Sequence, residues 1–190
     1  EVALGDLWAA MGGASDNLAQ AAVAKRIPRT VLALLVGASL GMSGTTMQAI
    51  TRNPLAEPGL LGVSSGAALA VVTGIAFVGL SGPYAYLAVA VAGSSLAAVF
   101  VYTVGSLGRG GATPLKLSLA GAATSAAIAS LINAILLPRI DVMDSYRFWQ
   151  IGGVGGASWD RITVVTPFLA AGAVVCLANA RSMNSLALGD

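Results

Sequence analysis

Few residues of this 190-residue sequence could carry out covalent chemistry. It contains no histidine, and its single cysteine, Cys176, stands among valine and leucine residues. A His/Cys metal cage and an internal disulfide are therefore excluded, and no Gly-x4-Gly-Lys-Ser/Thr phosphate loop occurs. We expect no cofactor, no metal site and no bound nucleotide, and we expect that the chain is not an enzyme. A membrane-embedded enzyme that uses a lone serine stays open as an alternative.

The composition indicates a membrane protein. Only 9% of the residues are charged, against about 25% in soluble domains, and the mean hydropathy is +0.83. Glycine is abundant, with 24 residues, which is typical of closely packed membrane helices. The net charge of +2 comes without a basic run, so we expect no nucleic-acid partner.

Five uncharged stretches predict the membrane spans. Each has 19 to 24 residues, enough for a helix to cross a hydrocarbon core of about 30 Å. They cover residues 31–51, 60–80, 84–107, 117–137 and 162–180. Because backbone groups in lipid must be satisfied internally, we predict an all-α polytopic membrane protein with five transmembrane helices. The spans hold no acidic residue, which argues against ion coupling within this part of the protein.

The connections predict the two sides of the membrane. We expect an extramembrane segment at 1–30, where Ser15 and Asp16 could cap a short helix, and a loop at 138–161 with a short surface helix over 143–151. With 81–83, these segments hold six of the ten Lys and Arg residues, while 52–59, 108–116 and 181–190 hold four. The charge count alone weakly favours a cytoplasmic position for the first side.

Small and polar residues within the spans predict helix contacts. We expect five glycines to pack helices together: Gly37, Gly41, Gly44, Gly62 and Gly66. The amides of Gln48 and Asn133 need polar partners within the membrane, so either interhelical hydrogen bonds or contact with a transported substrate would account for them.

A stiff turn joins the first two predicted spans. Pro54 and Pro58 each remove a backbone donor and forbid a continuous helix, and three glycines let the chain restart beyond them. The run from 26 to 66 includes Arg-Ile-Pro-Arg at 26–29, Gly-Met-Ser-Gly-Thr-Thr-Met-Gln at 41–48 and Asn-Pro-Leu-Ala-Glu-Pro-Gly-Leu-Leu-Gly at 53–62. Leu-Ala-Gly at 119–121, Phe-Trp-Gln-Ile-Gly-Gly at 148–153 and Asn-Ser-Leu-Ala-Leu-Gly-Asp at 184–190 follow later.

With these motifs the chain resembles the FecCD-type permease subunits of ABC importers for iron–siderophores, haem and vitamin B12. The resemblance implies a subunit of about ten helices, of which this chain is a piece covering helices two to six. It implies a second permease subunit as homodimer or heterodimer partner, cytoplasmic ATPase subunits and an extracytoplasmic substrate-binding protein. It places 1–30 and 138–161 outside, 181–190 at the start of the cytoplasmic coupling region, and the whole protein in the bacterial cytoplasmic membrane.

The same resemblance implies roles for individual residues. Arg26 and Arg29 match arginines that dock the binding protein, although anchoring to lipid phosphate would also explain them. Asn53 and Leu55 match a cytoplasmic gate, although they could serve the turn alone. The external gate region corresponds to Pro138, Arg139 and Ile140, where Arg139 departs from the small polar residues of some family members.

The sequence therefore predicts a permease subunit of an ABC importer, most often in this family for an iron–siderophore, with haem or vitamin B12 as further cargoes. The alternative is a membrane scaffold or interaction module without a transport pathway.

Overall fold

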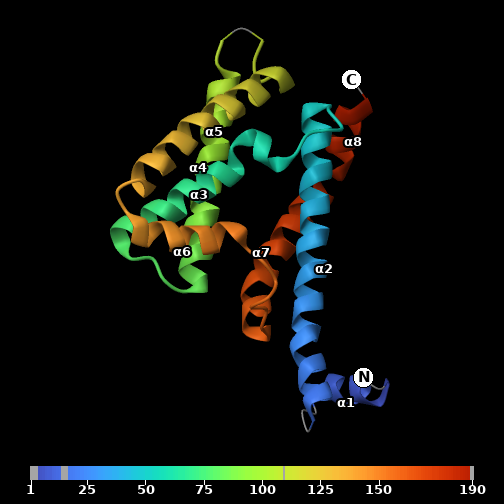
Figure 1. Ribbon diagram of the computed structural model, residues 1–190. Helices are drawn as coiled ribbons and strands as arrows, with labels where there is room; N and C mark the ends of the chain where they lie inside the picture. The colour runs from blue at the N-terminus through green and yellow to red at the C-terminus, as the bar shows by residue number, and fades with distance from the viewer. Residues whose placement is uncertain (1–3, 14–16, 109, 189–190) are drawn as a thin grey trace. The chain divides into compact units, whose positions relative to one another are not determined.

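The computed structural model describes residues 4–13, 17–108 and 110–188 (Figure 1). Helices joined by turns and loops make up these ranges, without a strand in them, which confirms the all-α prediction. The elements are α1 (Leu4–Met11), α2 (Leu18–Thr51), the 3-10 helix η1 (Pro58–Leu61), α3 (Val63–Thr73), the π-helix η2 (Gly74–Val78), α4 (Pro83–Ser106), α5 (Pro114–Leu136), α6 (Ile140–Ile151), α7 (Trp159–Ala178) and α8 (Ala180–Leu188).

Four helices of the described structure are long and apolar enough to cross a membrane: α2, α4, α5 and α7. They correspond to four of the five predicted spans. The polytopic character of the chain is thereby confirmed.

The expected span at 60–80 has a different form. Here η1 is followed by α3 and η2. The last two elements together form an apolar helix over Val63–Val78, which is too short to count as a membrane span by its length. Gly62 and Gly79, at φ values of 69° and 67°, bound this helix in the left-handed region that glycine adopts without strain. Val71 and Val72 have no exposed surface, and Gly66 and Ala68 are buried as well, so one side of α3 is packed against protein.

Helix α2 begins well before the expected span at 31–51 and runs for 34 residues through Pro28. Its first turn is held by Asn17, whose Oδ1 accepts a hydrogen bond of 2.8 Å from the backbone N–H of Gln20. The Asn17 and Gln20 amides also donate to Asp6 Oδ1, at 3.2 Å and 3.3 Å, and so join α1 to α2. The predicted cap residues Ser15 and Asp16 lie outside the described residues.

The chain divides into two compact units. One comprises residues 1–42 and 153–177, and the other comprises residues 43–152 and 178–190. In the second unit α3 packs against α4 and α5, and α6 contacts α3, η2 and α5. The core of this unit consists of Ala68, Val72, Ile128, Ile132, Leu136, Val142 and Tyr146.

Glycine makes the contact between α3 and α4 possible. A Cβ added at Gly66 would overlap the carbonyl oxygen of Gly93 and the Cβ of Ala97, and a Cβ at Gly93 would overlap Gly66 and Ala70. The two backbones therefore touch directly, as small residues allow in membrane helices. A similar contact joins α5 to η1, because a Cβ at Gly121 would overlap the Leu60 carbonyl oxygen.

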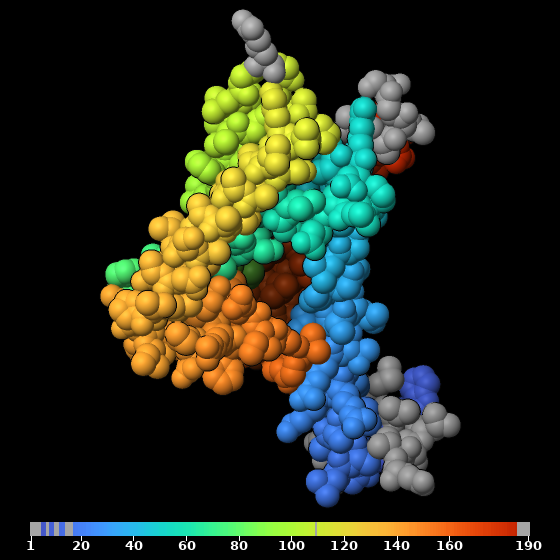
Figure 2. All heavy atoms as spheres, turned by 45° about the horizontal axis from the view of Figure 1, so that its top comes forward, coloured from blue at the N-terminus to red at the C-terminus, as the bar shows by residue number. Residues whose placement is uncertain are grey.

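Helix α6 is packed into the second unit rather than lying free of it. Val142 and Tyr146 are buried, and the Tyr146 and Trp149 rings stack with centroids 6.1 Å apart. The helix ends where Gly152 and Gly153 adopt φ values of 63° and 135°. Figure 2 shows α5 and α6, in yellow and orange, adjoining on one face.

Candidate functional site

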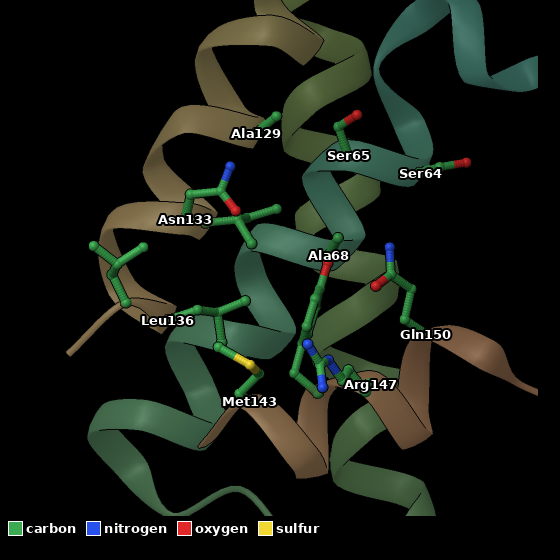
Figure 3. A pocket seen from close by; sticks show the side chains of 12 residues that line it. Ser64, Ser65, Ala68, Ala129, Asn133, Leu136, Met143, Arg147 and Gln150 are labelled. Atoms are coloured by element: carbon green, nitrogen blue, oxygen red, sulfur yellow. The ribbon is translucent and has the colours of Figure 1, made fainter. Parts of the chain in front are cut away.

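A cavity of about 480 Å³ opens between α3, α5 and α6 within the second unit (Figure 3). It is lined by Ser64, Ser65 and Ala68 of α3, by Ala129, Ile132, Asn133, Leu136 and the adjoining Leu137 of α5, and by Met143, Tyr146, Arg147 and Gln150 of α6. The α6 residues, like the first four of α5, follow the spacing i, i+3, i+4, i+7, so each helix presents one continuous face to the cavity.

The cavity has an apolar floor and a polar wall. The floor consists of core residues, among them Ala68, Ile132 and Leu136. We use the name polar wall for Ser64, Ser65, Asn133, Arg147 and Gln150, whose side chains surround the opening in Figure 3. A site of this kind can hold a ligand by its apolar surface and orient it through a few polar groups.

The side chains of the polar wall make no hydrogen bond to any other residue that the structure describes. Other hydroxyls in the spans behave differently. Ser94, Thr103 and Ser130 each donate to the carbonyl one turn earlier in their own helix, at 2.8, 2.7 and 3.1 Å. The polar wall thus keeps its donors and acceptors available to another molecule.

The charge of the cavity lining is positive. Twelve residues line the cavity, and the charged one among them is Arg147, which is exposed. The two acids of α6, Asp141 and Asp144, do not line the cavity. Burial raises the pKa of Tyr146 above its ordinary value, so its phenol stays neutral. No group of residues suited to hold a metal occurs in the described part of the chain. This arrangement can bind and orient, and it favours an anionic ligand.

The predicted external gate region lies at the corner between α5 and α6. Pro138 and Ile140 are exposed, while Arg139 reaches back to η2. Its guanidinium donates a hydrogen bond to the carbonyl of Ala76 and lies 4.4 Å from the centre of the Phe77 ring. Carbonyls in the last turn of a helix lack partners within the helix, so Arg139 satisfies one of them and ties the corner to η2.

The predicted cytoplasmic gate residues lie in the turn after α2. Asn53 Oδ1 accepts a hydrogen bond of 2.9 Å from the backbone N–H of Leu55, and Ala56 N–H donates to the Asn53 carbonyl at 3.1 Å. This Asx turn buries Ala56 and leaves the Leu55 side chain 86% exposed. Asn53 therefore shapes the turn, and Leu55 is the side chain that the turn presents.

The predicted docking arginines, Arg26 and Arg29, are both exposed on α2 on either side of the buried Pro28.

The predicted packing glycines fall into two groups. Gly62 ends η1 at a positive φ, and Gly66 lies against α4. A Cβ at Gly37, Gly41 or Gly44 would meet no atom within 4 Å in the described structure.

Sequence reasoning did not single out Arg147, Gln150, Ser64 or Ser65. The residues at 143, 146, 147 and 150 lie on one helical face, and this spacing within the expected surface helix was the available signal. Their pairing with Asn133 depends on the angle between α5 and α6, which the sequence does not specify.

The helices define a polytopic membrane protein. The chain matches the FecCD transport family over residues 1–190 and belongs to that family. It is a multi-pass protein of the cytoplasmic membrane.

Three curated relatives show the extent of the similarity. The chain is 46% identical over 166 residues to the ferric enterobactin transport system permease protein of Escherichia coli, covering 87% of this chain and 49% of that protein. It is 35% identical to the hemin transport system permease protein of Yersinia pestis, covering 87% and 51%. It is also 35% identical to the Fe(3+) dicitrate transport system permease protein of Escherichia coli, covering 96% and 55%.

The fold is similar to that of a solved structure, an inward-facing metal-chelate-type ABC transporter, with a TM-score of 0.75 at 25% identity. The match covers 87% of this chain and 52% of that one. The chain thus spans about half the length of the relatives that it matches.

Proposed function

We propose that the chain forms part of the permease subunit of an ATP-binding-cassette importer. The observation that carries this proposal is the family match over all 190 residues, together with four helices suited to cross a membrane. Such a subunit provides a path for its cargo and changes between outward and inward access without covalent chemistry. ATP hydrolysis belongs to a separate cytoplasmic subunit, and this chain is not an enzyme.

The proposed cargo is an iron–siderophore. Its support is the 46% identity to the ferric enterobactin permease, against 35% for the hemin permease over the same share of this chain. Haem and vitamin B12 are the alternative cargoes within the family. The proposed partners are a second permease subunit, cytoplasmic ATPase subunits, a substrate-binding protein outside the membrane, and the surrounding lipid.

The predicted site residues receive roles in this plan. Arg26 and Arg29 dock the binding protein through charge-assisted contacts. Leu55, presented by the Asx turn of Asn53, narrows the cytoplasmic exit. The corner at Pro138, Arg139 and Ile140 forms part of the external gate. Gly37, Gly41 and Gly44 offer a small-residue face to another helix of the complete transporter.

The test of this function uses the full-length gene in its parent cell. Deletion should abolish the uptake of radioactive iron supplied as a ferric siderophore, and a plasmid copy should restore it. Unchanged siderophore uptake after deletion would contradict the cargo assignment. Loss of haem or vitamin B12 uptake instead would keep the permease class and replace the cargo.

A further inference from the structure

The polar wall combines one cation with neutral hydrogen-bonding groups on three helices. Arg147 and Gln150 lie one turn apart on α6, Asn133 faces them from α5, and Ser64 and Ser65 begin α3 (Figure 3). A guanidinium offers several N–H donors in a planar fork, and the amides and hydroxyls add further donors nearby. This set of groups suits a ligand rich in negatively charged oxygen atoms.

We propose that the cavity is a contact site for an anionic, oxygen-rich ferric chelate during its passage, with Arg147 as the residue that selects for negative charge. This inference rests on the proposed function, which it deepens by naming the charge class of the cargo. Asn133, Gln150 and Ser65 orient the chelate through hydrogen bonds, and the apolar floor contacts its less polar surface.

The burial of the cavity lining separates this role from a structural one. Core residues of the same cavity, such as Ile132 and Tyr146, are buried, whereas Asn133, Arg147 and Gln150 are exposed. Polar side chains that serve only to stabilise a helix bundle are expected to bond to each other or to their own helix, as Ser94 and Ser130 do. The side chains of the polar wall do neither within the described structure.

The proposal divides ferric chelates by charge. Three singly charged hydroxamates balance Fe³⁺ and give a neutral complex, whereas catecholate and citrate complexes of ferric iron carry net negative charge. Arg147 has no acidic neighbour in the cavity lining, so it attracts the anionic catecholate and citrate complexes and gives no advantage to the neutral hydroxamate complexes. Catecholate or carboxylate chelates are therefore favoured over neutral hydroxamates as the cargo.

The first experiment measures uptake by the full-length permease with its partners in cells. Radioactive ferric iron is supplied with a tris-catecholate chelator, with citrate, or with a tris-hydroxamate. Arg147→Gln should lower the uptake of an anionic complex about tenfold, the loss expected when one charge-assisted hydrogen bond is removed. Arg147→Glu should lower it further, and Arg147→Lys should retain most of it because the positive charge remains.

Arg161→Gln provides the matched control. Arg161 lies in the same predicted external segment and is exposed, but it is not among the cavity residues. Uptake by this variant should equal that of the wild type. Membrane abundance of every variant is measured, so that a loss of uptake is not confused with a loss of protein.

The second experiment reports on the cavity directly. In a full-length protein whose native cysteines, Cys176 among them, are replaced by alanine, a Ser65→Cys variant is treated with an anionic or a cationic thiol reagent of similar size. The anionic reagent should react several-fold faster because Arg147 lies in the same cavity, and Arg147→Gln should remove most of this difference. The ferric tris-catecholate complex should slow the labelling.

The outcomes separate this inference from the proposed function. If the wild-type protein takes up none of the ferric complexes, the iron–siderophore cargo of the proposed function fails. If it takes up an anionic complex that Arg147→Glu does not slow, or only the neutral complex, the anionic contact site is overturned. Resistance of Ser65→Cys to both reagents would also overturn it, because the cavity would then be filled by protein.

Discussion

The Arg139 guanidinium reaches the C-terminal end of η2, where it bonds to the Ala76 carbonyl and covers the Phe77 ring. The sequence placed Arg139 in a gate region but offered no partner for it. Its partners lie about sixty residues earlier in the chain and depend on how α6 packs against η2. A residue's contacts across such a separation follow from tertiary packing, which no local pattern encodes.

Replacing Arg139 with alanine should destabilise the full-length protein by about 1–3 kcal/mol, through loss of a charged hydrogen bond and a cation–π contact. Thermal unfolding in detergent should show a Tm lower by a few degrees. Arg139→Lys should recover part of the loss, and Arg161→Ala, which removes an exposed arginine, should change little. Equal Tm values for Arg139→Ala and Arg161→Ala would contradict the role of the contact.

Reversing the charges of Arg26 and Arg29 tests the docking role at the same scale. The double variant Arg26→Glu, Arg29→Glu should weaken the association of the substrate-binding protein at least tenfold, because favourable charge pairs become repulsive. Surface plasmon resonance on the full-length transporter in nanodiscs gives the measurement. The wild-type affinity should fall with rising salt and that of the variant should not. Unchanged docking would favour the scaffold alternative.

Among the elements, the predicted span at 60–80 shows that composition predicts an apolar segment but not where its helix begins and ends. The uncharged run has the length of a membrane helix, but the described structure divides it into η1, α3 and η2. Charge-free stretches show where a chain avoids water, whereas Gly62 and Gly79 decide where the helix starts and ends. Helix α2, by contrast, is longer than the uncharged run at 31–51, because Asn17 caps it within the preceding polar segment.

The contact between α3 and α4 gives a sharp prediction for one element pair. Gly93→Ala places a methyl group where the Gly66 backbone lies, so α3 and α4 must separate. We expect a destabilisation of about 1–3 kcal/mol or more, measured as thermal stability of the full-length protein in detergent. Spacing could nominate Gly66 from the sequence, but its partner Gly93 required the fold.

Gly172→Ala is the control for this prediction, since a Cβ there would meet no atom within 4 Å in the described structure and α7 is helical at this point. It should be neutral or slightly stabilising, because alanine favours a helix over glycine by up to about 1 kcal/mol. Comparable losses from Gly93→Ala and Gly172→Ala would show that the α3–α4 contact is not the cause.

For the molecule as a whole, the sides of the membrane follow from the order of the helices. Three elements that the chain passes through, α3, α4 and α5, separate the turn at 52–57 from the segment at 138–161. If each crosses the membrane, these two segments lie on opposite sides. The count of six against four basic residues weakly favours a cytoplasmic position for 138–161, whereas the family resemblance puts this segment outside. The helix over Val63–Val78 is too short to count as a span by length, so its crossing needs a direct test.

Cysteine labelling in intact cells decides between these orientations. Single cysteines are introduced into a full-length protein whose native cysteines, Cys176 among them, are replaced by alanine. Asp160→Cys lies in the first turn of α7 and Glu57→Cys lies in the turn after α2, and both positions are exposed. We expect a membrane-impermeant maleimide to label Asp160→Cys in intact cells and Glu57→Cys only after the membrane is opened. The reverse pattern would place the basic-rich side in the cytoplasm, where Arg26 and Arg29 could not meet an external binding protein. Labelling of both positions from outside would instead mean that α3, α4 and α5 do not all cross the membrane.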